Sequence, residues 1–143
     1  AQGYDTDLSG YVSKMGHHYG KTGLIDETFE LEKPEVLLYV PDGDEGMKFV
    51  AVEYLVTVPD PLNPPPPPEG FTGPEDVWFF NTDIGMWTLH VWVAMENSNG
   101  IFAAQNPALP YFNELLILFY VMPGPLSPAF LFCFPDLNKV QGI

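Results

Sequence analysis

The sequence predicts a mainly β protein, and three observations lead to that prediction. Short runs of β-branched and aromatic residues recur along the chain, each bounded by Pro or Gly. With 16 Pro and 13 Gly among 143 residues, little room is left for long helices. Hydrophobic residues make up 46% of the chain, enough to bury a core. We therefore expect one domain over residues 1–143, folded as a small barrel or a cupin-like (jelly-roll) sandwich with few short helices.

The first predicted element is a β-hairpin. Residues 35–40 (EVLLYV) and 47–58 (MKFVAVEYLVTV) are β-prone, and the PDGDEG sequence at 41–46 suits a tight reversal between them. Strict alternation places Phe49 and Glu53 on one face of the second run. Both faces are largely apolar, which predicts a strand buried on both sides. A carboxylate in such a strand is expensive unless another group pairs with it.

The middle of the chain alternates loops and strands. Residues 59–70 contain five successive prolines and read as a stiff polyproline II connection rather than a ligand for an SH3-like domain, because no basic residue flanks them. Residues 86–95 (MWTLHVWVAM) form a third β-prone run, preceded by a shorter one at 77–80. His90 lies in the middle of that third run. Residues 96–110 read as a loop with an Asn-Gly turn.

The last third of the chain is strongly apolar. Residues 111–121 (YFNELLILFYV) and 129–134 (AFLFCF) predict two buried strands, or a short helix and a strand. Both runs are too short to span a membrane. Cys133, the single cysteine, lies in the second run, where burial would leave it inert. We treat residues 111–143 as an apolar extension through which the chain could associate with itself.

The charge balance excludes several classes of partner. The chain has 19 acidic residues, five lysines and no arginine, so its formal net charge is −14. Nucleic acid and anionic membrane surfaces would repel it. The acidity and the 15% aromatic content suit a secreted, extracellular protein, and we predict that location.

Four residues form the inventory of a metal site. His18, Glu53 and His90 lie on separate segments, and neutral imidazole with carboxylate suits one divalent ion such as zinc, copper, iron or manganese. His17 is a further candidate, but adjacent residues on an extended segment point to opposite sides, so only one of the two histidines should join the site. The simpler alternative is that His90 and Glu53 hydrogen-bond each other or a tyrosine inside the core.

Five short segments follow one another along the chain: 15–19 (MGHHY), 33–39 (KPEVLLY), 52–54 (VEY), 89–93 (LHVWV) and 99–107 (NGIFAAQNP). Together they resemble the motifs of a family of small, mostly secreted, uncharacterised bacterial and fungal proteins. The family pattern runs MGxHY, RPExLxYEP, LVxVEY, LHVWxW and NPxGxFAxxNP, and the match covers roughly residues 10–110. The resemblance implies that His18, Glu53 and His90 are shared site residues and that His17 is variable. The family has no established activity, so a shared site is implied rather than a reaction. This chain departs from the pattern at Lys33, where the family often has Arg, and at residues 104–105.

Three functions remain open from the sequence. The leading one is a metal site formed by His18, Glu53 and His90, which, if catalytic, would activate a bound oxygen of a substrate that the sequence does not identify. The second is a secreted binding protein without chemistry, whose aromatic side chains enclose a sugar or a small apolar ligand. The third is a self-associating structural protein that uses the apolar extension. The aromatic candidates for the second function are Trp78, Phe79, Trp87 and Trp92.

Overall fold

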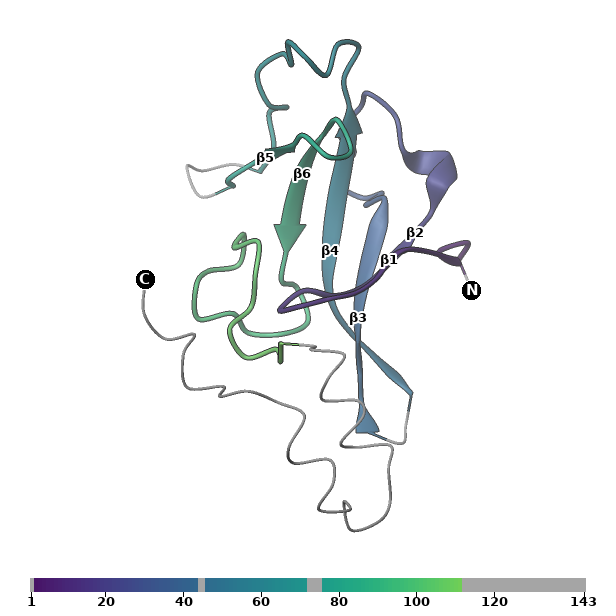
Figure 1. Cartoon of the computed structure of the whole chain (residues 1–143), viewed down its shortest axis with the longest axis vertical. Coiled ribbons are helices and arrows are strands. Elements are labelled where there is room, and N and C mark those ends of the chain that lie inside the picture. Colours follow the sequence, from purple (N-terminus) through teal and green to yellow (C-terminus); the bar gives the residue numbers. More distant parts are fainter. Residues whose placement is uncertain (1, 44–45, 72–75, 112–143) are drawn as a thin grey trace, which may run out of the picture. The chain divides into compact units, whose positions relative to one another are not determined.

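The computed structural model describes residues 2–43, 46–71 and 76–111, all within the compact unit Ala1–Phe112. The strands of these residues form one antiparallel sheet in the order β1-β2-β3-β4-β6-β5, which curls into a half-barrel (Figure 1). The predicted mainly β fold is confirmed, and η1 (Thr22–Leu24) is a short 3-10 turn. The strands span Thr6–Val12 (β1), Gly16–Gly20 (β2), Val36–Pro41 (β3), Met47–Thr57 (β4), Phe79–Asn81 (β5) and Met86–Val91 (β6).

The apolar extension predicted at 111–143, including Cys133, lies outside the described residues except for Tyr111. Its predicted strands or helix, and the self-association expected from it, stay predictions. In the part of the chain that the structure describes, no helix has the length and apolar character needed to cross a membrane.

The predicted hairpin is confirmed by strands β3 and β4. They pair antiparallel from Val36 opposite Glu53 to Pro41 opposite Met47. The backbone N–H of Asp42 donates to the carbonyl of Gly46 at 2.9 Å and closes the turn. Residues 50–56 of β4 are all buried, so the prediction of a strand covered on both faces also holds. Residues of β4 belong to two apolar clusters, one on each face of the sheet, and these clusters account for the burial.

A bulge in β4 changes which residues share a face. Leu38 pairs with Ala51, but the next residue of β3 pairs with Phe49, so Val50 is an extra residue in β4. Val50 and Ala51 both pack into one core cluster, whereas Phe49 packs against the other. The prediction that Phe49 shares a face with Glu53 is therefore wrong, because one extra residue exchanges the two faces of a strand.

The sheet separates two apolar clusters, and we name its faces after them. Both clusters are buried, which removes their apolar area from water and so stabilises the sheet. The inner face carries Val36, Leu38, Val40, Val50, Ala51, Leu55, Trp92 and Leu109. The outer face carries Val52, Tyr54, Leu89 and Val91, with partly buried aromatic residues packed against them.

The N-terminal segment forms two strands, β1 and β2. The sequence predicted only that the segment around the two histidines is extended. β1 is the edge strand of the sheet, and its first four residues are exposed. Neither face of such a strand is fully covered, so its apolar and polar residues need not alternate. The sequence pattern therefore does not reveal the strand. β2 pairs with both β1 and β3, which brings His17 and His18 into the sheet.

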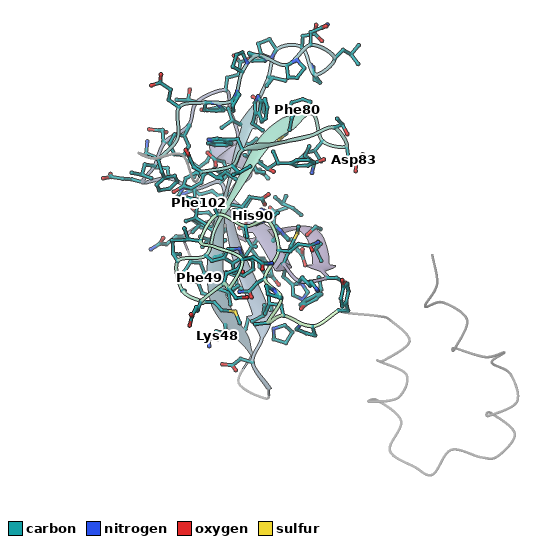
Figure 2. All side chains as sticks on the ribbon, turned by 90° about the vertical axis from the view of Figure 1, so that its left-hand side faces the viewer. Lys48, Phe49, Phe80, Asp83, His90 and Phe102 are labelled. Atoms are coloured by element: carbon teal, nitrogen blue, oxygen red, sulfur yellow. The ribbon has the colours of Figure 1, made fainter. Side chains whose placement is uncertain are left out.

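The third predicted run is confirmed as β6, although the strand ends at Val91 rather than continuing to residue 95. After β6 the chain leaves the sheet and forms the predicted loop. Two side-chain hydrogen bonds to backbone carbonyls stabilise this loop. The indole N–H of Trp92 donates to the carbonyl of Ala103 at 2.6 Å, and the Asn106 amide donates to the carbonyl of Glu96 at 2.9 Å. Within the unit that the structure describes, Figure 2 shows His90 between Lys48 on one side and Phe80 and Asp83 on the other.

Candidate functional site

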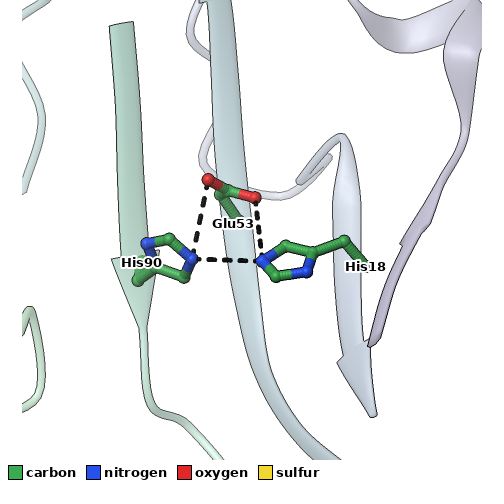
Figure 3. A group of neighbouring side chains, drawn as sticks. All are labelled: His18, Glu53 and His90. Atoms are coloured by element: carbon green, nitrogen blue, oxygen red, sulfur yellow. Dashed lines mark hydrogen bonds and ion pairs between the residues drawn. The ribbon is translucent and has the colours of Figure 1, made fainter. Parts of the chain in front are cut away.

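The three predicted site residues converge on the inner face. His18 lies on β2, Glu53 on β4 and His90 on β6, and Figure 3 shows the side chains turned toward one another. Glu53 and His90 are directly opposite across the β4–β6 pair, as predicted for neighbouring strands. β2 lies three strand positions from β6, about 14 Å apart in a flat sheet. The curl of the half-barrel therefore brings His18 to His90.

The contacts between ligand atoms of the three side chains are 3.5 to 3.8 Å long. The Nε2 atoms of His18 and His90 lie 3.5 Å apart. Glu53 Oε1 lies 3.6 Å from His90 Nε2, and Glu53 Oε2 lies 3.8 Å from His18 Nε2. These contacts are longer than the roughly 2.7–3.2 Å of ordinary N–H···O hydrogen bonds. Tetrahedral ligand atoms about 2.1 Å from an ion would lie about 3.4 Å apart, close to the observed separations.

Burial shifts the pKa values of all three side chains. His18 is 6% exposed, and Glu53 and His90 are each 7% exposed. Burial lowers the pKa of His18 to about 4 and, with the charge of His18, that of His90 to about 3. Burial also raises the pKa of Glu53 to about 8, with a smaller contribution from Glu35. Near pH 7 both imidazoles are therefore neutral and keep a lone pair for a ligand, while the carboxyl holds a proton.

His17 does not join the group. It points to the other side of β2, where its Nδ1 lies 3.4 Å from Asp7 Oδ2 on β1. Its ring stacks with Tyr19 at a centroid distance of 6.2 Å. Of the two adjacent histidines, His18 is the one that lies in the group.

Two further residues belong to the surroundings of the group, and sequence reasoning missed both. Ser9 Oγ on β1 lies 3.0 Å from His18 Nδ1. Glu35 is 2% exposed, and its Oε2 accepts the backbone N–H of Leu55 at 2.9 Å. Burial raises the pKa of Glu35 to about 7. A signal for Glu35 was present in the sequence, because an acidic residue directly precedes the apolar run of β3.

The aromatic residues suggested for a ligand pocket lie in different places. Trp92 is buried in the inner cluster, and Trp87 packs against Phe80 with its indole N–H donating to Pro65. Phe79 lines a cavity of about 640 Å³ together with Phe102. A different cavity, of about 540 Å³, is lined by tyrosines and their neighbours: Gln2, Tyr4, Tyr19, Leu37, Tyr39 and Met47. We call this second cavity the tyrosine pocket.

Comparison of the chain with protein-family models, with curated proteins and with solved structures gives no match. The resemblance to the uncharacterised secreted family therefore stays a prediction. What the chain itself provides is a buried His/Glu/His group, from three strands, whose ligand atoms lie within 4.8 Å of one another.

Proposed function

We propose that this protein binds one divalent transition-metal ion through His18, Glu53 and His90. The spacing of the three side chains supports this most directly. Each contributes a ligand atom, all within 4.8 Å of one another, and the separations exceed hydrogen-bond lengths. A purely structural set of buried polar groups would be expected to shorten these contacts into hydrogen bonds.

The electrostatics of the group also support a cation. Among the described residues, the two histidines are the basic groups that Glu53 contacts, and both are neutral near pH 7. A buried carboxylate without a counter-charge costs several kcal/mol, so it either keeps its proton or pairs with a cation. A divalent ion would compensate its charge and use both imidazole lone pairs at once.

The donor set narrows the choice of metal. Two imidazoles and one carboxylate form the protein ligands of many zinc sites and of non-haem iron(II) sites. Three protein ligands leave positions for water or a substrate, toward which such an ion acts as a Lewis acid. Secretion, predicted from the acidity of the chain, stays a prediction.

The proposal is tested by metal analysis and by calorimetric titration of the metal-free protein with Zn²⁺, Fe²⁺, Mn²⁺ and Cu²⁺. We expect one ion per chain. His18→Ala and His90→Ala should abolish this binding, and Glu53→Gln should weaken it strongly while preserving the size of the side chain.

His17→Ala is the matched control, because it removes an imidazole from the next position on the opposite face of β2. It should leave the affinity unchanged. Equal losses in His17→Ala and His18→Ala would contradict the proposal. A parent protein that is folded but takes up none of the four ions would contradict it as well.

The tyrosine pocket supports a second candidate function, the binding of a neutral sugar. The rings of Tyr19 and Tyr39 meet at 82° with centroids 5.8 Å apart, so they present a ring face and a ring edge side by side. Aromatic faces pack against apolar ligand surface, and the tyrosine hydroxyls and the Gln2 amide provide polar partners. The net charge of −14 disfavours anionic sugars.

The two functions can be separated because His18 and Tyr19 lie on opposite faces of β2. Titration with a neutral glucose oligosaccharide, followed by NMR, should shift the tyrosine resonances of the parent. Tyr19→Ala should remove this response and keep metal affinity, whereas Phe79→Ala, in the other cavity, should change neither. Unchanged tyrosine resonances in the parent would exclude this candidate for that ligand.

A further inference from the structure

The edge strand β1 reaches the buried group through one side chain. Between the pairs Asp7 with Tyr19 and Tyr11 with His17, three residues of β1 lie opposite the single residue His18. The middle one of the three is Ser9, whose Oγ lies 3.0 Å from His18 Nδ1. The irregular register of β1 is thus located where the strand contacts the site.

The local sequence holds this irregular turn in place. The Asp7 carboxylate accepts the backbone N–H of Ser9 at 3.3 Å and that of Gly10 at 2.8 Å. Gly10 has a φ of 64°, in the left-handed region that glycine adopts without strain. Leu8 packs over Gly20, where an added Cβ would come within 2.5 Å of its side chain. These contacts direct Ser9 toward the inner face.

The proton count of the Ser9 hydroxyl favours His18 as the donor in the Ser9–His18 hydrogen bond. The Ser9 hydroxyl has one proton and donates it to the carbonyl of Gly10 at 3.0 Å. Its oxygen then accepts the proton of His18 Nδ1, and the Gly16 backbone is a further hydrogen-bond partner of His18. A neutral His18 with its proton on Nδ1 has a free lone pair on Nε2, the atom that faces Glu53 and His90.

We propose that Ser9 is a positioning residue, which holds His18 in the tautomer that can bind a metal ion and so couples metal binding to the docking of β1. This inference rests on the proposed metal function of His18. An ion at Nε2 makes the Nδ1–H a stronger donor, which strengthens its bond to Ser9. By linkage, the bound ion stabilises docked β1, and docked β1 raises the affinity for the ion.

The tautomer is measured first, in metal-free protein, by ¹⁵N–¹H correlation NMR of the histidine rings. The parent should show His18 with its proton on Nδ1. Ser9→Ala should give a mixture of tautomers, and Ser9→Thr, which keeps the hydroxyl, should restore the parent pattern. Ser13→Ala, in the turn between β1 and β2, is the matched control and should leave the pattern unchanged.

Metal affinity and hydrogen exchange are measured next on the same variants. Ser9→Ala should weaken metal binding by about 10–100-fold, the usual effect of losing a partner of a ligating histidine. Metal should slow amide exchange in β1 of the parent and of Ser13→Ala, and should do so much less in Ser9→Ala.

The outcomes separate this inference from the proposed function. If the parent binds metal but Ser9→Ala keeps both the tautomer and the affinity, the role of Ser9 is overturned and the metal site stands. If the parent binds no metal, the proposed function fails, and the coupling to metal fails with it. The tautomer measured in metal-free protein then decides whether Ser9 orients His18.

Discussion

Strand β2 places two adjacent histidines in opposite surroundings. His18 faces the inner side of the sheet, with its side chain 8% exposed between Glu53 and His90. His17 faces the outer side, with its side chain 24% exposed beside an acidic residue of the edge strand. Residue type is the same at both positions, so the difference in chemistry comes from burial and neighbours alone.

The largest effect is expected from a pair of leucines on β3. Leu38 is fully buried in the inner cluster, whereas Leu37 is partly buried on the outer face. Leu38→Ala should lower the free energy of unfolding by about 2–5 kcal/mol because it leaves a cavity. Leu37→Ala should cost about 1 kcal/mol. Urea unfolding of both variants measures the difference, and equal losses would show that the two faces contribute alike.

The next effect is the stabilisation by metal. An ion present at about 100 times its Kd should raise the free energy of unfolding by about 2.7 kcal/mol, because it binds the folded state. His17→Ala should keep this gain and His18→Ala should lose it. The comparison is made by urea unfolding with and without the metal. A gain that survives in His18→Ala would place the ion elsewhere.

A smaller effect is expected from pH on the metal-free protein. Glu53 has a folded-state pKa of about 8, above its ordinary 4.5, so its contribution is present below pH 4.5 and is lost as pH rises through 8. His18 and His90 have lowered pKa values, so their contribution is present above pH 6.5 and is lost as pH falls toward 4. The free energy of unfolding should therefore be greatest near about pH 6 and fall on both sides by about 1 kcal/mol or more.

Urea unfolding between pH 4 and pH 9 measures this curve. Glu53→Gln should make the loss of stability at alkaline pH smaller. Part of that loss should remain, because Glu35 also has a raised pKa. Metal binding at pH 7 should release about one proton, which calorimetry in two buffers of different ionisation enthalpy detects. An alkaline side unchanged in Glu53→Gln would contradict the assignment.

The smallest effect is expected at an exposed ion pair that belongs to neither cluster. Lys33 Nζ lies 2.8 Å from Glu30 Oε1, and both side chains are about half exposed. Lys33→Ala should leave the free energy of unfolding almost unchanged, because water screens such pairs. Thermal unfolding at low and high salt checks this. A larger, salt-independent loss would mean that Lys33 acts through packing rather than charge.

The sequence predicted the hairpin and the central strands because both carry long apolar runs bounded by turn residues. It did not predict β1, whose residues are polar and whose edge position needs no apolar alternation. It also placed Phe49 on the wrong face, because nothing in the alternation marks Val50 as the extra residue of a bulge.

The candidate site followed from two ionisable residues in the middle of apolar strands. Glu53 and His90 needed partners, and the resemblance added His18. Ser9 was not predicted because its contact depends on a three-residue irregularity opposite a single residue of β2. The alternation of apolar and polar residues also does not predict the curl of the sheet. That curl is what brings His18 to His90.

The separation of the group along the chain has a consequence for folding kinetics. His18 and His90 are 72 positions apart, so their meeting requires β2, β4 and β6 to be in place together. Contacts between such distant segments are slow to form. A metal ion that binds only the completed site stabilises the native state without stabilising the transition state. It should therefore slow unfolding while leaving the folding rate unchanged, so that the two arms of the chevron respond differently to the ion.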